Sequence, residues 1–336
     1  MTNPLRKGLA ACVALALSFG LVACSSSSES GDAASGSESG SQSGEAAPTV
    51  DRSGDANFPD VTGDYGEEPT ISAGTGTEPT HISVRTLSKG DGAEVTSSDF
   101  LLVNYAGTLW NGKVFDSSFT NGSPAAFSLD QVIEGWKYGL AGQHVGDRVQ
   151  LVIPSEWGYG ETGSGDAQSG QEATIPANAT LVFVVDIIDS VDPSDTSALK
   201  DAKATDDELP AGITVTGDLG SEPKLSFSGT TQPKDSVTTL ATGTGAEVST
   251  SDYVVYHAVG GYFGDADSAT GTWPDNAQLL SPGVTEVVGK TVGSRIVIVY
   301  GPTQDATESG ATESTTSATV MVVDILGVLH DPDSAS

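Results

Sequence analysis

The sequence has little of the chemistry that most enzymes use. Its 336 residues include two cysteines, both within the first 24 positions, and four scattered histidines, His81, His144, His257 and His330. Neither residue type shows the spacing of a metal site. No phosphate-binding loop and no G-x-S-x-G nucleophile motif is present. These absences argue against metal-dependent, redox, phosphoryl-transfer and hydrolase activities, and we expect neither a metal nor a cofactor.

Basic residues are also scarce. Lysine and arginine together number 14 against 45 aspartates and glutamates, which gives a formal net charge of −31. Such an excess of negative charge argues against nucleic acid or an anionic bilayer surface as a partner. The acidic segment 192–209 lacks the residue spacing of a calcium-binding EF-hand loop. We therefore interpret it as a linker.

Long hydrophobic runs are missing, and the one apolar run near the start is too short to span a membrane. It follows two basic residues and ends in Leu-Val-Ala-Cys, which resembles a bacterial lipobox. We predict a lipoprotein signal peptide over 1–23 and lipid on Cys24. The protein would then be exported and anchored by acyl chains to the outer face of the cytoplasmic membrane, at the cell surface. The alternative is an ordinary signal peptide with a chance cysteine. Residues 24–57, rich in Ser, Gly and acidic residues, would form a flexible tether.

Aromatic residues make up only 6% of the chain, yet they cluster between residues 103 and 188. Within this stretch, residues 100–105, 147–153 and 181–188 alternate in the manner of half-buried strands. Asn111-Gly112 is a hairpin turn signal. Ile133, Trp136 and Leu140 fall on one face of a short helix. One short helix against an antiparallel sheet is an α+β arrangement.

Several blocks in this stretch occur in the order and near the spacing of a known family. They are Tyr105-Ala-Gly, Phe115-Asp-Ser-Ser, Val132-Ile-x-Gly-Trp, Ile153-Pro, Gly158-Tyr-Gly and Ile175-Pro-x-x-Ala-Thr-Leu. Residues 85–190 thereby resemble the FK506-binding-protein (FKBP-type) peptidyl-prolyl cis-trans isomerases. The resemblance implies a twisted antiparallel sheet wrapped around a short helix. It also implies catalytic roles for Tyr105, Asp116 and Tyr159, and a substrate-binding surface made of Phe115, Phe127, Val132, Ile133, Trp136, Ile175 and Phe183.

The function implied by the resemblance is isomerisation of X-Pro bonds in exported polypeptides, which would assist protein folding. The resemblance further implies macrolides of the FK506 and rapamycin type as ligands. Ala125 stands where many relatives carry an aromatic residue, and the segment 161–173 is longer than the family's loop. Two alternatives therefore stay open: a non-catalytic chaperone module that binds proline-containing segments, and a spacer that keeps only the fold.

An internal repeat indicates two tandem domains. VTGDYGEEP (61–69) returns as VTGDLGSEP (215–223), and GDGAEVTSSDF (90–100) returns as GTGAEVSTSDY (243–253). We predict an isomerase domain over 58–191 and a degenerate FKBP-like domain over 210–330. In the second copy Ala258 falls where Tyr105 was, and no tryptophan follows in the Val132 block. Its strand positions survive, and we expect one sheet face from Val254, Ile296, Ile298, Val320 and Val322.

Overall fold

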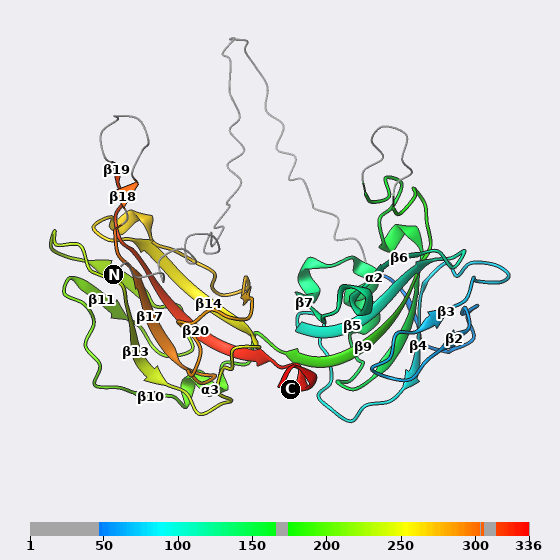
Figure 1. Cartoon of the computed structure of the whole chain (residues 1–336), viewed down its shortest axis with the longest axis horizontal. Coiled ribbons are helices and arrows are strands. Elements are labelled where there is room, and N and C mark those ends of the chain that lie inside the picture. The colour runs from blue at the N-terminus through cyan, green and yellow to red at the C-terminus, as the bar shows by residue number, and fades with distance from the viewer. Residues whose placement is uncertain (1–46, 166–173, 303, 306–313, 336) are drawn as a thin grey trace, which may run out of the picture. The chain divides into compact units, whose positions relative to one another are not determined.

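The computed structural model describes residues 47–165, 174–302, 304–305 and 314–335. Residues from Ala47 onward form one compact unit. It contains two lobes, each built on a seven-stranded sheet (Figure 1). Few helices accompany the strands, so the α+β prediction is confirmed. None of the helices in the described part is long and apolar enough to cross a membrane.

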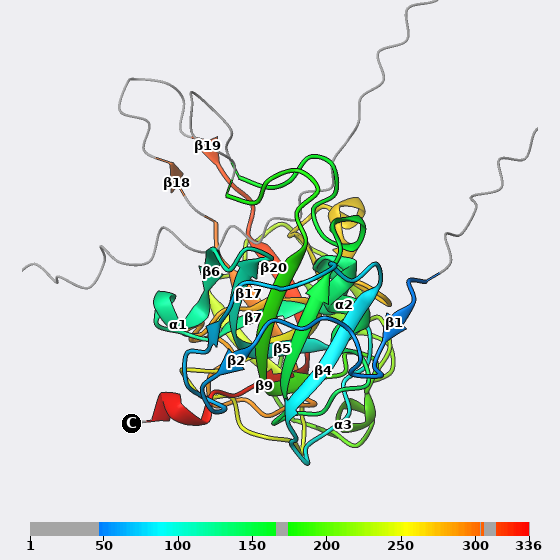
Figure 2. The same cartoon turned by 90° about the vertical axis from the view of Figure 1, so that its right-hand side faces the viewer.

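The first sheet has the strand order β1-β4-β8-β9-β5-β6, with β7 also paired to β5. Only the β1–β4 pair is parallel. Figure 2 shows β1 at the edge of this sheet beside β4, and β9 further into the sheet, where β8 separates it from β4. The strands are β1 (Val50–Asp51), β4 (Ile82–Ser88), β5 (Phe100–Leu109), β6 (Val114–Ser117), β7 (Ala125–Ser128), β8 (Arg148–Ile153) and β9 (Leu181–Val191). A small separate hairpin consists of β2 (Val61–Thr62) and β3 (Thr70–Ile71).

The second sheet repeats this order as β10-β13-β17-β20-β14-β15, with β16 paired to β14. The repeat seen in the sequence is thus a repeat of strand order, although β10 pairs antiparallel with β13 whereas β1 pairs parallel with β4. The strands are β10 (Lys203–Ala204), β13 (Ser236–Thr242), β14 (Tyr253–Tyr262), β15 (Thr270–Gly271), β16 (Gln278–Leu280), β17 (Arg295–Tyr300) and β20 (Thr319–Leu329). Two further hairpins consist of β11 (Ile213–Thr216) with β12 (Lys224–Phe227), and β18 (Gln304–Asp305) with β19 (Ser314–Thr315).

The helical segments are short. They are α1 (Ser118–Asn121), η2 (Leu129–Gln131), α2 (Glu134–Leu140), η3 (Ser155–Trp157), α3 (Ser197–Lys200), η4 (Ala266–Ser268) and η5 (Pro332–Ala335). Helix α2 packs on β8 and β4 and buries Trp136 and Leu140, as the spacing predicted. Gly135 permits this close approach, because a Cβ there would lie 2.3 Å from Cγ2 of Ile153.

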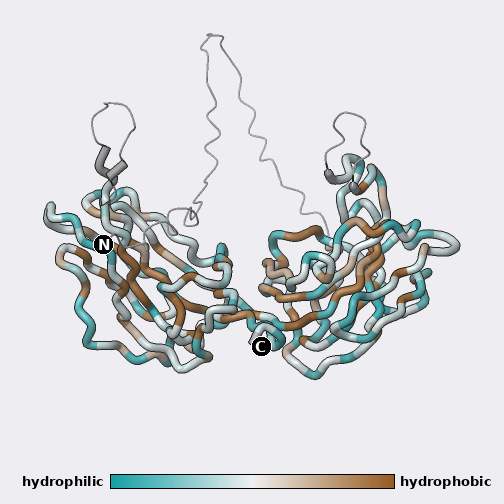
Figure 3. The backbone as a smooth tube through the Cα atoms, viewed as in Figure 1, coloured by the Kyte–Doolittle hydropathy of each residue, from teal (hydrophilic) through white to brown (hydrophobic). Residues whose placement is uncertain are grey.

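The two faces of the first sheet bury different side chains. The face beneath α2 carries the predicted alternating positions, including Leu101, Val103, Leu151 and Val185. The opposite face is covered by residues 58–74, which we call the strap, against Ala106, Val152, Val182 and Val184. Burial on both faces explains why β9 is apolar over most of its length (Figure 3).

Residues 209–227 cover the corresponding face of the second sheet, and we call them the second strap. A buried arginine holds each strap. Arg148 is 2% exposed; its Nε lies 2.6 Å from Oδ1 of Asp186, and its guanidinium donates to the carbonyls of Gly63 and Glu67. The second lobe repeats this contact. Arg295 pairs with Asp324 at 2.7 Å and donates to backbone carbonyls of the segment 217–221. Both copies of the repeated VTGDxGxEP segment therefore bind a buried arginine through backbone carbonyls.

The second lobe differs from the first at the place of α2. Its segment 281–290 forms turns rather than a helix. Met321 and Val323 join Val254, Ile296 and Ile298 on the face that corresponds to the one beneath α2. The prediction that Val320 and Val322 share this face is wrong, because both lie on the opposite face beneath the second strap. The strand β20 is apolar on both faces, so its sequence alone did not show which of its side chains lie on which face of the sheet.

Two predicted boundaries also require correction. Residues 50–52, which we assigned to the tether, belong to the first lobe. Strand β1 pairs with β4, and Arg52 donates to the carbonyls of Tyr138, Gly139 and Ala141 at the C-terminal end of α2. A cation at that end of a helix is favourable. Residues assigned to the linker form α3 and β10, and Leu199 is 1% exposed in a hydrophobic cluster. Long-range pairing and burial, which composition does not reveal, order both segments.

Candidate functional site

Four aromatic rings meet edge to face above the first sheet. The Trp136 ring lies 5.1 Å from the Phe183 ring, 5.1 Å from the Phe127 ring and 5.4 Å from the Tyr105 ring, measured between centroids. Phe115 lies 5.5 Å from Phe183 on the far side. Edge-to-face packing is the preferred geometry of aromatic pairs. Trp136 and Phe183 are about 5% and 4% exposed, whereas the other three rings are half-buried. The cluster thus has a buried base and a partly open upper surface.

The Asp116 carboxylate connects this cluster to the exposed surface. Its Oδ2 accepts a hydrogen bond from the Tyr105 hydroxyl, and its Oδ1 accepts the Ser117 N–H at 2.9 Å. Ser118, buried at the start of α1, accepts the Tyr105 N–H on its Oγ at 2.9 Å. Burial, the bond to Asp116 and its negative charge all raise the pKa of Tyr105. The Tyr105 hydroxyl therefore stays protonated near neutral pH.

The start of α2 supplies backbone polarity next to the rings. Ile133 is the residue that precedes the helix, with an extended backbone (φ −60°, ψ 146°). Its carbonyl accepts from the N–H groups of Trp136 and Lys137. A backbone N–H at this position has no partner within the helix. Val132 and Ile133 are half-buried and pack against the same core as the rings.

Tyr159 lies on a short loop closed by backbone hydrogen bonds. The Gly160 N–H donates to Ser155 and the Asn178 N–H donates to Gly160, both at 2.8–2.9 Å. These bonds fix the backbone while the Tyr159 side chain remains 38% exposed. Burial raises the pKa of Tyr159, and the negative charge of Asp116 raises it further. The carboxylate therefore influences both hydroxyls.

The structure brings together the predicted residues of the first lobe. Eight of them share one hydrophobic cluster, namely Tyr105, Phe115, Phe127, Val132, Ile133, Trp136, Ile175 and Phe183. Asp116 joins through its bond to Tyr105, and Tyr159 joins through the charge of Asp116. Cys24 lies outside the described residues.

Two contributors were missed from the sequence. A Cβ at Gly107 would lie 2.7 Å from Phe115 and 2.8 Å from Phe183, so only glycine lets these rings meet. The glycine of the Tyr-Ala-Gly block was the available signal. Glu68 of the strap lies 3.3 Å from the hydroxyls of Ser117 and Thr120, beside Asp116. No local pattern places Glu68 there, because the contact spans about fifty residues of chain.

The second lobe does not rebuild the aromatic cluster. Ala258 pairs with Val323 as Tyr105 pairs with Val185, and Met321 occupies the register position of Phe183. Its one stacked aromatic pair among the described residues, His257 over Trp273 at 4.2 Å, lies beside Thr272.

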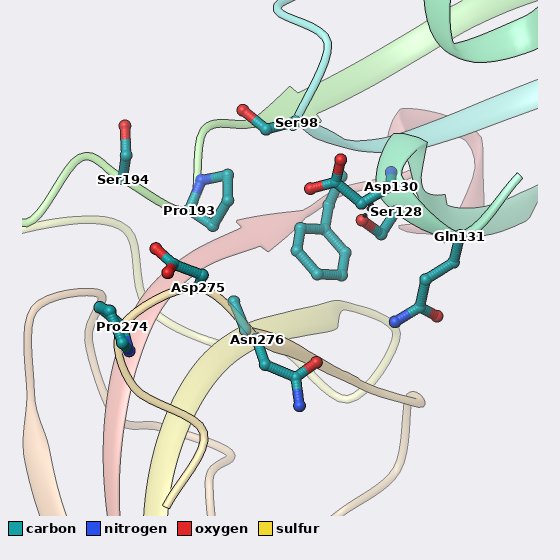
Figure 4. A pocket seen from close by; sticks show the side chains of 11 residues that line it. Ser98, Ser128, Asp130, Gln131, Pro193, Ser194, Pro274, Asp275 and Asn276 are labelled. Atoms are coloured by element: carbon teal, nitrogen blue, oxygen red, sulfur yellow. Dashed lines mark hydrogen bonds between the residues drawn. The ribbon is translucent and has the colours of Figure 1, made fainter. Parts of the chain in front are cut away.

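A separate polar cavity of about 190 Å³ shares none of the predicted site residues. Figure 4 shows its lining side chains, which come from the ends of strands and from loops. They are Ser98, Phe100, Ser128, Asp130, Gln131, Pro193, Ser194, Pro274, Asp275, Asn276 and Ala277. Most are short polar groups or carboxylates. No group of His, Cys, Asp and Glu suited to holding a metal occurs among the described residues, this cavity included.

Comparison with known proteins shows which family the first lobe resembles. Residues 92–188 match the FKBP-type peptidyl-prolyl cis-trans isomerase family. The chain is 41% identical over 112 residues to FK506-binding protein 2 of Debaryomyces hansenii, which covers 32% of this chain and 77% of the yeast protein. At that identity and coverage the chain belongs to the FKBP-type peptidyl-prolyl cis-trans isomerase family.

Two bacterial relatives are similar over the same region. A probable FKBP-type peptidyl-prolyl cis-trans isomerase of Haemophilus influenzae is 48% identical over 102 residues, covering 30% of this chain and 39% of that protein. FkpA of Escherichia coli is 40% identical over 146 residues, covering 43% and 51%. Its crystal structure aligns with 33% of this chain and 48% of its own, with 41% identity and a TM-score of 0.30. The chain thus spans about two fifths to one half of these relatives' lengths.

Proposed function

We propose that the first lobe catalyses cis/trans isomerisation of X-Pro bonds in polypeptides. The observation that carries this proposal is the aromatic cluster around Trp136, with a buried base and a partly open top, rimmed by two hydroxyls that respond to one carboxylate. A proline ring is apolar and flat enough to lie on such a surface. Family membership supports the same activity.

The reaction rotates a bond without breaking one. Amide resonance produces a barrier of about 18–20 kcal/mol, and an X-Pro bond isomerises unaided in tens to hundreds of seconds. A site that binds the twisted amide better than the planar amide lowers that barrier. The twisted carbonyl and nitrogen are less polarised than the planar amide, so an apolar surface around Trp136 favours the transition state.

The polar groups on the rim hold the substrate in the required orientation. The Tyr159 hydroxyl would donate to a substrate carbonyl, and the raised pKa of Tyr159 keeps its proton in place. The Ile133 N–H would donate to a second carbonyl. Asp116 holds the Tyr105 ring upright through the hydroxyl. These groups are fixed before the substrate arrives, which is the arrangement that electrostatic catalysis requires.

The activity is tested by exchange NMR on an Ala-Leu-Pro-Phe peptide with micromolar protein. We expect cis/trans exchange faster than in the peptide alone, and we expect an FK506-type macrolide to suppress it. A folded protein that leaves the exchange rate unchanged would refute catalysis.

The second candidate function is a binding module without catalysis. It is favoured by Ala125, which pairs with Val103 and is too small to extend the aromatic surface on that side of the cluster. Retained peptide binding without exchange would support that candidate.

We further propose that the natural substrates are exported polypeptides and that the protein is held at the outer face of the cytoplasmic membrane by lipid on Cys24. The lipobox-like ending of the apolar run supports this. We predict that Cys24→Ala leaves the protein unprocessed or releases it from the membrane fraction. Mass spectrometry of the N-terminal peptide and fractionation of the membrane are the measurements. A correctly cleaved Cys24→Ala protein that stays at the membrane would contradict the proposal.

A further inference from the structure

Exposed acidic residues adjoin the residues of the proposed site along the chain, and we call these acidic residues the rim. Four carboxylates, of Asp116, Glu134, Glu156 and Glu161, are all on exposed residues. Asp116 is itself part of the site, and Glu134 is the first residue of α2. Glu156 and Glu161 lie three residues before and two residues after Tyr159, on the loop that hydrogen bonds close.

Positive charge does not balance this rim. Residues 47–191 contain 20 acidic and six basic residues. Arg148 is buried in its ion pair, Lys137 lies 2.6 Å from a carboxylate, and Arg85 lies over an aromatic ring of the strap. Arg52 donates to carbonyls at the C-terminal end of α2, and Lys89 follows β4, outside the blocks that form the site. The sixth, Lys113, directly precedes β6 and has no paired carboxylate within the described residues.

The negative charge of Asp116 reaches the two hydroxyls of the proposed site. Asp116 raises the pKa of both Tyr105 and Tyr159, which shows its influence at two hydroxyls. Exposed charges act over about 8 Å at physiological ionic strength. An extended peptide advances about 3.3 Å per residue, so the two or three residues on either side of a bound proline lie within this field. Surface potentials of this kind raise encounter rates of oppositely charged ligands by about 10- to 1,000-fold.

We propose that this site selects proline segments flanked by lysine or arginine and discriminates against segments flanked by aspartate or glutamate. The inference rests on the proposed isomerase function and names its substrate class. Each flanking cation gains favourable interaction with the rim, whereas each flanking anion is repelled. The apolar contact with the proline ring is the same for both.

The test compares three peptides that share one Leu-Pro core and carry lysine, glutamate or alanine at two positions on each side. Their kcat/KM values are measured by exchange NMR on the full chain. At about 0.01 M ionic strength we expect the lysine peptide to exceed the glutamate peptide by about tenfold, with the alanine peptide between them. At about 1 M, where the screening length falls to about 3 Å, the ratio should approach one.

Two charge-matched variants localise the effect. Glu134→Gln/Glu156→Gln/Glu161→Gln removes three rim carboxylates, and the control Asp206→Asn/Asp207→Asn/Glu208→Gln removes three exposed carboxylates that precede the second lobe. We expect the lysine-to-glutamate ratio to fall severalfold in the first variant and to stay unchanged in the control. Circular dichroism and thermal melts confirm that both variants are folded.

The outcomes separate this inference from the function on which it rests. Equal kcat/KM for the lysine and glutamate peptides, with the alanine peptide catalysed, would overturn the charge preference and leave the isomerase proposal standing. A preference that survives about 1 M salt, or that falls equally in both variants, would overturn its assignment to the rim. Absence of catalysis for all three peptides would overturn both proposals.

Discussion

At the scale of single residues, Asp116 is the side chain on which the proposed site most depends. It accepts from Tyr105, and its charge is felt by Tyr159. Both tyrosines are partly exposed, and within the described residues neither hydroxyl makes a hydrogen bond to the core. We therefore expect changes at these polar groups to affect turnover more than folding.

The corresponding prediction concerns Asp116→Ala and Tyr159→Phe. Each removes one polar contact worth about 1–1.5 kcal/mol, which corresponds to about a tenfold lower kcat/KM. The measurement is exchange NMR on the same peptide, with thermal melts to verify that each variant is folded. A folded variant with unchanged kcat/KM would remove that residue from the mechanism. Phe58→Leu, in the strap, is a control outside the site.

A second residue-scale prediction concerns His257 in the second lobe. Burial lowers the pKa of His257 to about 4, below about 6.5 in the unfolded chain. Between these values the unfolded state binds more protons, so stability is lost as pH falls from 6.5 towards 4. The loss amounts to about 3 kcal/mol and is complete near pH 4. The groups that face this ring are Thr272, Trp273 and the acidic Asp275 and Asp324.

Urea unfolding of the second-lobe transition at several pH values measures this effect. The control is His257→Asn, which introduces the residue found at the equivalent position of the first lobe, Asn104. We expect the variant to lose less stability than the wild-type protein between pH 6.5 and 4. Identical pH dependence in both proteins would show that the imidazole is not the group responsible.

At the scale of elements, the buried arginines link strap and sheet. Arg148 bridges the carboxylate of β9 and two strap carbonyls, and Arg295 does the same in the second lobe. Removing one partner of a buried pair leaves the other charge without compensation. The straps also cover apolar faces that would otherwise meet water.

We predict that Arg148→Met destabilises the first lobe by about 3–5 kcal/mol, because Asp186 remains buried without its partner. Arg295→Met should destabilise the second lobe by a similar amount. Urea titration followed by circular dichroism gives the free energies of unfolding. The double variant Arg148→Met/Asp186→Leu should recover much of the loss. If Arg148→Met costs less than about 1 kcal/mol, the pair does not hold the strap.

At the scale of the whole molecule, the two lobes share a strand order and differ in chemistry. The second sheet is complete and has its own core. Where the first lobe has the rings of Tyr105 and Phe183, the second lobe has Ala258 and Met321. The second lobe also has no helix equivalent to α2 in its described segment 281–290. An apolar surface this small excludes too little water to favour a twisted amide.

We therefore predict that the second lobe folds but does not catalyse. The test disables the first lobe within the full chain by Tyr105→Ala/Asp116→Ala/Tyr159→Phe and measures the remaining exchange rate. We expect a rate within a fewfold of the uncatalysed peptide. The second lobe expressed alone from residue 195 should give a folded circular dichroism spectrum and no catalysis. Rates comparable to the wild-type chain in either protein would contradict the prediction.

The local pattern of the sequence determined much of this protein. Alternation in the long strands placed Leu101, Val103 and Val185 on one face, and the spacing of Trp136 and Leu140 placed α2. The ordered aromatic blocks identified the family and the residues that gather above the sheet. Each of these features can be recognised from residues a few positions apart, or from motifs that recur in the second copy or in the family.

Only the tertiary structure decided what depends on distant contacts. The strap contacts of Glu68 and the capping of α2 by Arg52 join residues about fifty to ninety positions apart. The sequence of β20 did not show on which side of the sheet Val320 lies. Both faces of that strand are apolar, so the alternation of side chains does not distinguish one face from the other. The early start of the first lobe and the order in the linker likewise follow from strand pairing, which composition does not encode.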